Sequence, residues 1–177
     1  MTEQIDRLLQ HPKYRARLEL LQEMEQNRIY CGHNLEHFMK VGCIAEQVVV
    51  KNELPFSEDV IFGAALLHDV GRVEQYRQGI SHEKASVAFA REILFSLNWD
   101  VSDIEMVCEA IGSHSHRQCA ADSWEKMSAL VSLAEVISFA DQFSRTCYRC
   151  HVADTCKWKE EEKINKAFFK EISNENW

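Results

Sequence analysis

The chain is poor in the two residues that most often interrupt helices, with two prolines and six glycines among 177 residues. It also lacks the Asn-Gly and Asp-Gly pairs that form tight hairpin turns, and it shows little of the strict apolar–polar alternation of a half-buried strand. These absences argue against a β-sheet fold. Apolar residues instead recur at helical spacing, so we predict a single all-α domain over residues 1–177, a bundle of about six to seven helices.

Long apolar runs and excess positive charge are missing as well. No run approaches the roughly 20 apolar residues that cross a bilayer, and the polar start of the chain has no apolar core of an export signal. We therefore expect a cytoplasmic protein with no membrane partner. The net charge is −8, and affinity for nucleic acid rests on clustered Lys and Arg, so we do not expect nucleic acid as a partner. The oligomeric state is not predictable from these features.

Capping residues and breakers divide the chain into seven predicted helices. They cover residues 13–26, 34–51, 57–68, 81–97, 102–114, 122–145 and 157–172. Ser102-x-x-Glu105 and Asp122-x-x-Glu125 have the spacing of capping boxes and mark two of the starts. Gly71 fits the end of the third helix, because a residue just past a helix often needs a positive φ.

Histidine and aspartate occupy unexpected places in these predicted helices. His68 and Asp69 follow the apolar helix end Gly63–Leu67, and Asp141 stands inside the apolar stretch Val136–Phe143. Because burying an unpaired charge is expensive, such carboxylates need partners, and a metal ion is one. Imidazole nitrogen and carboxylate oxygen both suit first-row divalent ions. A lone His-Asp pair is a weak signal, but His37 at the start of an earlier helix strengthens it.

Three segments in this order resemble the HD-domain superfamily of metal-dependent phosphohydrolases, and the core motifs span residues 31–145. The matching segments are His37-Phe-Met-Lys-Val, Ala65-Leu-Leu-His-Asp-Val-Gly-Arg72 and Ala140-Asp141. The resemblance implies a helical HD-type fold and metal ligation by His37, His68, Asp69 and Asp141. The run from Gly71 to Leu94 is similar to one small branch of that superfamily. Some members of the superfamily hold two metals through additional histidines, and His82 and His114 occupy the corresponding places here.

The ligand set predicts hydrolysis of a phosphate ester by metal-activated water. A divalent ion with an open position lowers the pKa of bound water, which yields a nucleophile near neutral pH. One or two ions fit, and Mn, Fe, Co, Ni, Zn and Mg remain open as the metal. Asp69 would be the natural bridging ligand between two ions, while His82 or His114, where not a ligand, could protonate the leaving oxygen. The expected substrate is a small phosphorylated compound such as a nucleotide.

Two further residues are candidates for substrate contact, each with an alternative interpretation. Arg72 could grip a phosphate with its planar guanidinium, or it could be a cation favoured at a helix C-terminus. His33 is one turn before His37 and could share its helical face. It could contact the substrate, support the ligands, or be an ordinary helix-start residue. The sequence leaves these alternatives open.

The seven cysteines are an odd number in a chain without an export signal, so we do not expect a disulfide framework. Cys43 and Cys108 lie in apolar helical patterns and are predicted core residues. Three others fall in the cysteine-containing C-terminal segment 146–177.

Those three are Cys147, Cys150 and Cys156, and the Cys-x-x-Cys spacing is that of half a structural zinc site. Cys31 is a sensible fourth ligand, because it precedes His37 by six residues as Cys147 follows Asp141 by six. His151 is the alternative fourth ligand, although simultaneous ligation by its neighbour Cys150 would be awkward. A structural zinc or iron–sulfur site and unligated thiols are the two alternatives.

Two other functions compete with hydrolysis. A regulatory module could keep the metal and bind a nucleotide without turnover, and a phosphatase screen with added Mn²⁺ or Co²⁺ separates it from an enzyme. A helical oxygenase with two irons would instead carry redox-active iron and a visible absorption band.

Overall fold

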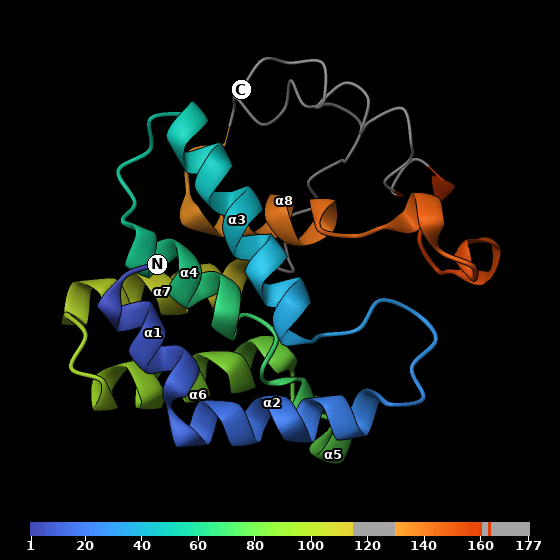
Figure 1. The fold of residues 1–177 in the computed structure, drawn as a ribbon, viewed down its shortest axis with the longest axis horizontal. Coiled ribbons are helices and arrows are strands. Elements are labelled where there is room, and N and C mark those ends of the chain that lie inside the picture. Colours follow the sequence, from blue (N-terminus) through green and yellow to red (C-terminus); the bar gives the residue numbers. More distant parts are fainter. Residues whose placement is uncertain (115–129, 161–162, 164–177) are drawn as a thin grey trace.

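The computed structural model describes residues 1–114, 130–160 and 163, and these residues form helices with no strand among them. Figure 1 shows the arrangement. The helices are α1 (Glu3–Gln10), α2 (Pro12–Glu25), α3 (Leu35–Lys51), α4 (Glu58–Leu67), α5 (Arg72–Gln78), α6 (His82–Ser96), α7 (Val101–Ser113) and α8 (Leu133–Phe143), followed by the 3₁₀ turns η3 (Cys147–Arg149) and η4 (Ala153–Thr155). The predicted all-α class is confirmed.

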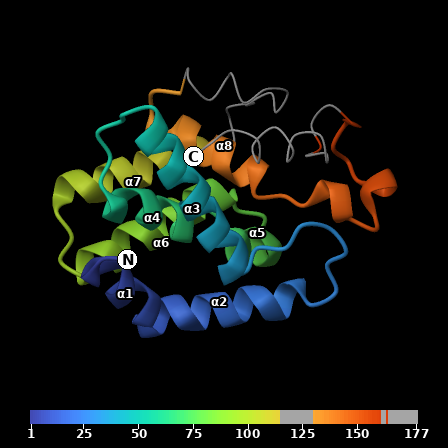
Figure 2. The same ribbon diagram turned by 45° about the horizontal axis from the view of Figure 1, so that its top comes forward.

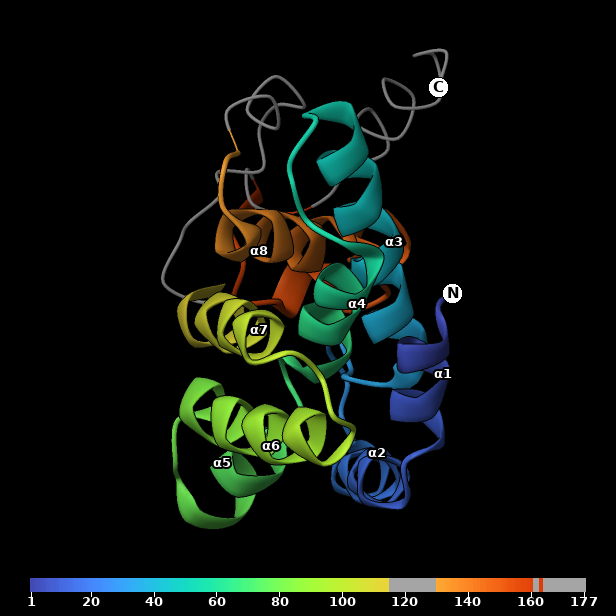
Figure 3. The ribbon, with the colours of Figure 1, turned by 90° about the vertical axis from the view of Figure 1, so that its left-hand side faces the viewer.

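Helix α4 forms the centre of the bundle. Every residue from Val60 to Leu67 is buried, as expected of a helix that is apolar on all sides. Helices α3 and α7 pack against α4, and Figure 3 shows α4 between them. His68 and Asp69 directly follow the last turn of α4, so the chain delivers these two polar side chains to the interior of the bundle.

Helix α3 brings the first half of the chain against the last described helix. Its buried stripe of apolar residues packs on α4 and α8. Asn34 caps α3, its side chain accepting a hydrogen bond from the backbone N–H of His37. His37 and Asp141 therefore lie on two helices that contact each other directly.

Tyr14 fixes α2 against the end of α4. Its buried hydroxyl donates a 3.0 Å hydrogen bond to the backbone carbonyl of Leu66, one of the last-turn carbonyls that a helix leaves without an internal partner. Burial raises the pKa of Tyr14, so the hydroxyl keeps its proton. This contact holds the turn that carries His68 and Asp69.

Gly71 does not have the predicted positive φ, because its φ is −73°. A Cβ atom at this position would lie 2.3 Å from the backbone oxygen of His82 and 2.4 Å from the backbone nitrogen of Ser86. Its own N–H donates a 2.9 Å hydrogen bond to Oγ of Ser86. The glycine is therefore required by close packing of the turn after α4 against the start of α6.

One predicted helix start is wrong, and one predicted helix is interrupted. The N-cap position of α7 is Asp100, which makes no side-chain capping hydrogen bond, and Ser102 falls inside the first turn. Helix α8 starts at Leu133, where Ser132 and Glu135 form a capping box, and residues 130–132 are not helical. A single helix from residue 122 to 145 is excluded by that interruption, and the predicted start at Asp122 lies outside the described residues.

The short helices α1 and α5 were not expected from the sequence, since each is too short to show a clear periodic pattern. The predicted helix 157–172 is not helical at residues 157–159, and most of the remainder lies outside the described residues. None of the described helices is long and apolar enough to span a membrane.

Candidate metal centre

Three predicted ligands, one on α3, one at the C-cap of α4 and one on α8, come together beside the end of α4. Nε2 of His37 lies 3.3 Å from Oδ1 of Asp141, and Nε2 of His68 lies 4.0 Å from the same oxygen. His68 is fully buried, whereas Asp141 is 26 % exposed. Donor atoms of His37, His68 and Asp141 all lie within 4.8 Å of one another, so this group could hold a metal ion.

Hydrogen bonds at the far side of each ring fix which nitrogen faces this point. Nδ1 of His68 contacts the carbonyl oxygen of Ala65 at 2.7 Å, and a carbonyl only accepts, so Nδ1 carries the proton. Ser144 Oγ donates its one proton to the carbonyl of Asp141 at 2.7 Å and therefore accepts from Nδ1 of His37 at 3.1 Å. In the neutral form of both rings, Nε2 holds the free lone pair.

The buried Nε2 atoms of His37 and His68 have no hydrogen-bond partner among the described residues. Burial lowers the pKa of His37, and it lowers the pKa of His68 to about 4, so the rings are neutral at pH 7. Their lone pairs then face a carboxylate oxygen of Asp141, which is also an acceptor. These three atoms are all hydrogen-bond acceptors, so they repel one another unless a cation lies between them. Two imidazole nitrogens and a carboxylate oxygen are ligands that suit a divalent ion.

Asp69 lies at the middle of a second group of imidazoles. Its Oδ1 is 3.2 Å from Nε2 of His82 and 4.0 Å from Nε2 of His114, while its Oδ2 is 3.5 Å from Nε2 of His68. Nδ1 of His114 contacts the carbonyl of Ile111 at 2.7 Å, the same arrangement as in His68. His68, Asp69 and His114 form a second group with donor atoms within 4.8 Å, and His68 is the member that it shares with the first group.

The charge on Asp69 is maintained despite its burial. Burial alone would raise the pKa of Asp69, but nearby positive charge, including that of the Arg72 guanidinium, holds it well below the usual range of a carboxyl. Burial likewise lowers the pKa of His82 to about 4. The centre therefore combines an ionised carboxylate with neutral imidazoles, which is the protonation state that metal binding requires.

Arg72 starts α5 and turns back to Asp69. Its Nε donates to Oδ1 of Asp69 at 3.0 Å, and its Nη1 donates to Gln75 at 2.9 Å. It lies beyond the end of α4 and begins the next helix, so it is a neighbour of the carboxylate rather than a last-turn residue of α4. Whether it also contacts a substrate stays a prediction.

His33 links Asp69 to a second carboxylate. Its Nε2 lies 3.3 Å from Oδ2 of Asp69, and its Nδ1 lies 2.5 Å from Oε1 of Glu25. Glu25 also accepts hydrogen bonds from the His33 backbone at 2.7 Å and from the Tyr76 hydroxyl at 2.5 Å. His33 therefore occupies the position of a support for Asp69, held from behind by α2 and α5.

Sequence reasoning missed Glu25, Ser144 and Arg145 at this centre. Ser144 stands three residues after Asp141, a spacing that could have suggested a shared helical face. Arg145 lies with Nη2 3.9 Å from Oδ2 of Asp141 and its guanidinium 4.0 Å above the ring of Trp158. Glu25 had no sequence signal, because its role depends on the packing of α2.

Of the six described cysteines, two lie on α-helices and four gather around one cavity. Cys108 is buried as predicted, but Cys43 is exposed on α3, because its position falls beside the buried stripe rather than within it. The other four line one cavity away from the His–Asp centre. They are Cys31, Cys147, Cys150 and Cys156.

Comparison with known proteins gives three matches. Residues 34–146 match the family model described as HD domain. A protein of Clostridium beijerinckii (strain ATCC 51743 / NCIMB 8052), described as an uncharacterized protein, is 30 % identical over 162 residues, which are 92 % of this chain and 96 % of that protein. A crystal structure from an uncultured Thermotogales bacterium, described as a predicted HD superfamily hydrolase, has a TM-score of 0.59 at 19 % identity and covers 97 % of this chain and 95 % of its own. This last likeness concerns the fold.

Proposed function

The chain belongs to the HD domain family, and we propose that it is a metal-dependent phosphohydrolase that cleaves a phosphate ester of a small molecule such as a nucleotide. One observation carries the proposal. The buried Nε2 atoms of His37 and His68, without a partner among the described residues, point to Asp141 beside the ionised Asp69. This arrangement is costly unless a cation completes it.

His37, His68, Asp69 and Asp141 would hold one ion, and His82 and His114 would hold a second one through Asp69. When bound, a divalent ion lowers the pKa of water toward neutrality and polarises a phosphoryl oxygen. The residues around the ligands have separate tasks. Ser144 and the carbonyls of Ala65 and Ile111 keep the imidazole protons on Nδ1, so that Nε2 stays available.

Proton delivery to the leaving oxygen would fall to His82 or His114 where either is not a ligand. Nε2 of His82 faces Asp69, and its Nδ1 lies 3.3 Å from Oε2 of Glu83. These carboxylates favour the protonated ring, but burial outweighs them and lowers the pKa of His82 to about 4, so His82 would act as the acid only if a bound substrate raised that pKa. A general acid needs both a held proton and a position beside the reacting group.

An anionic substrate is supported by a cavity of about 170 Å³ that opens beside His37. Lys40 and Arg145 both line it, but Lys40 donates to Glu36 of the same lining at 2.7 Å, so the positive charge offered to a ligand comes mainly from Arg145. Nη1 of Arg145 is buried and has no hydrogen-bond partner among the described residues. Because a guanidinium matches two phosphate oxygens at once, Arg145 is our candidate for holding the phosphoryl group.

The test is a screen of phosphorylated small molecules with added Mn²⁺ or Co²⁺, using the wild-type chain and Asp69→Asn. We expect turnover in the wild type and a loss of about 100-fold or more in the variant, since a ligand counts at least as much as its supporting residues. Asp6→Asn, an exposed carboxylate on α1, is the matched control. Tight nucleotide binding without turnover of any compound would refute the enzyme and favour a regulatory module.

A further inference from the structure

Two surface segments lie side by side (Figures 1 and 2), and neither contributes a buried hydrophobic residue to the core. One is the loop 26–34 before α3, where residues 26–32 are all exposed, and the other is the stretch 145–160 after α8, in which no residue is buried. The hydroxyl of Tyr30 donates a 3.0 Å hydrogen bond to the carbonyl of Thr155 across them. One exposed hydrogen bond contributes little to stability, so a further cross-link would be needed to hold the two segments firmly together.

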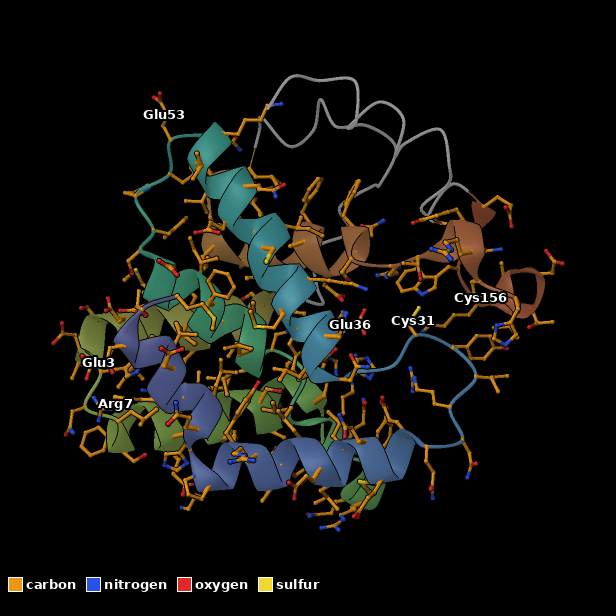
Figure 4. All side chains as sticks on the ribbon, in the orientation of Figure 1. Glu3, Arg7, Cys31, Glu36, Glu53 and Cys156 are labelled. Atoms are coloured by element: carbon orange, nitrogen blue, oxygen red, sulfur yellow. The ribbon has the colours of Figure 1, made fainter. Side chains whose placement is uncertain are left out.

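The two segments bring four cysteines to the lining of one cavity of about 250 Å³. Cys31 comes from the loop, and Cys147, Cys150 and Cys156 come from the stretch after α8. Figure 4 shows Cys31 facing the segment that carries Cys156. Sequence proximity cannot explain this gathering, because α3 to α8 separate Cys31 from the other three.

We propose that Cys31, Cys147, Cys150 and Cys156 bind one structural zinc ion that joins the loop before α3 to the segment after α8. Four thiolates in tetrahedral arrangement are a common structural zinc site, and the ion takes the place of a hydrophobic core in such short irregular segments. This site is separate from the His–Asp centre, and the proposal does not depend on the proposed phosphohydrolase activity.

The local backbone supports this ligand set. Turn η3 starts at Cys147, and the backbone N–H of Cys150 donates a 3.1 Å hydrogen bond to the carbonyl of Cys147. Turn η4 ends in the same way, with the N–H of Cys156 donating to Ala153 at 3.2 Å. The Cys-x-x-Cys turn is the usual means by which one short segment offers two thiolates to one zinc ion.

Charge around the cavity also suits zinc. Four thiolates and one Zn²⁺ carry a formal charge of −2, and Arg149 and Lys163 both line the cavity. Zinc binding would release the protons of these thiols, as thiolate ligation does generally.

Binding would also tighten the segment. Among the described residues, the two His–Asp groups are the sets of three or more ligand atoms that lie within 4.8 Å of one another. The four cysteine sulfurs line one cavity, but no three of them lie that close together. Zinc–sulfur bonds of about 2.3 Å require the sulfurs to approach one another.

The first experiment uses the wild-type chain. Thiols of the reduced, metal-free protein are alkylated with iodoacetamide in the absence and presence of one equivalent of Zn²⁺, and each cysteine is quantified by mass spectrometry. We expect at least about tenfold slower modification of the four cavity cysteines with zinc and no change at Cys43, the exposed cysteine on α3. Equal protection of all or none of these residues would overturn the proposal.

The second experiment measures metal content after purification. Cys147→Ser/Cys150→Ser should lose one equivalent of zinc relative to the wild type, whereas Cys43→Ser should retain it. Replacing the zinc with Co²⁺ should give the thiolate-to-cobalt charge-transfer band in the wild type but not in the double variant. Iron with inorganic sulfide in place of zinc, or an unchanged zinc content in the double variant, would contradict the assignment.

Discussion

Nε2 of His37 lies 3.3 Å from Oδ1 of Asp141, although one residue starts α3 and the other lies near the end of α8. The contact joins the first and last described parts of the HD domain match, 34–146. Because Nε2 of His37 has no hydrogen-bond partner among the described residues, a bound cation would complete the pair. Replacing His37 should therefore change metal binding more than it changes folding.

We predict that His37→Ala lowers the affinity for Mn²⁺ or Co²⁺ by about 100-fold or more, because a ligand contributes at least as much as the groups that orient it. Isothermal titration calorimetry measures the affinity, and circular dichroism checks the helix content. Gln47→Ala, an exposed position on the same helix, is the control. Unchanged affinity in His37→Ala would remove this residue from the ligand set.

Ser144→Ala tests the support of that ligand. The variant loses the oxygen that accepts from Nδ1 of His37, so the ring can rotate or shift its proton to Nε2. We expect metal affinity to fall by about 10-fold to 100-fold, with partial recovery in Ser144→Thr, which restores the hydroxyl. Equal affinities in the wild type and Ser144→Ala would show that the helix alone orients the imidazole.

Gly71→Ala tests the close approach of the turn after α4 to α6. The added Cβ would lie 2.3 Å from the backbone oxygen of His82, so the start of α6 must move. We expect a loss of about 2–4 kcal/mol in the free energy of unfolding. Gly112→Ala is the matched control, since Gly112 lies inside α7 and its Cβ would lie 3.5 Å from Val87 of α6, and it should gain about 0.5–1 kcal/mol. Urea denaturation measures both, and similar effects at the two glycines would contradict the packing argument.

Glu25 gives a defined dependence of stability on pH. Burial alone would raise the pKa of Glu25, but hydrogen bonds from His33 and Tyr76 bring it down to about 2 from an ordinary value of 4.5. A depressed carboxyl pKa stabilises the fold above pH 4.5, and this contribution is lost as the pH falls from 4.5 toward 2.

Glu25→Gln should therefore be less stable than the wild type at pH 7, by on the order of 2 kcal/mol. The difference should shrink as the pH falls through that range. Chemical denaturation of both proteins at pH 7, 4.5 and 3 measures it. A difference that stays constant over this range would mean that Glu25 contributes through packing and not through its charge.

The fold class was predictable because its signal is local: few breakers and apolar residues at helical spacing. The convergence of His37, His68 and Asp141 followed from the resemblance of their segments to a known family. Gly71 was assigned the wrong role, because its constraint comes from α6 across the bundle rather than from its own φ. Cys43 was misplaced for a related reason, since a helical pattern does not fix the edge of the buried stripe.

The supporting residues were the least predictable part of the centre. Glu25 acts through His33, and both contacts exist only because α2 lies beside the turn after α4. Such residues need no sequence motif, since a carboxylate from any neighbouring helix could serve. Helices α7 and α8 show a similar limit. Ser102-x-x-Glu105 and Ser132-x-x-Glu135 have the same spacing, but only Ser132 and Glu135 form a capping box.

The burial of α4 on every side also determines how the centre exchanges with solvent. Amide hydrogens along Val60–Leu67 have no local opening that would expose them, because each side of the helix contacts another part of the bundle. They should exchange at the rate of global unfolding, and so the backbone that carries His68 and Asp69 is as rigid as the fold allows. His37 and Asp141, at 15 % and 26 % side-chain exposure, are the accessible members of the set. An ion would therefore enter and leave between the start of α3 and the end of α8, and the rate of its release would report the motion of those helix ends rather than any loosening of the interior.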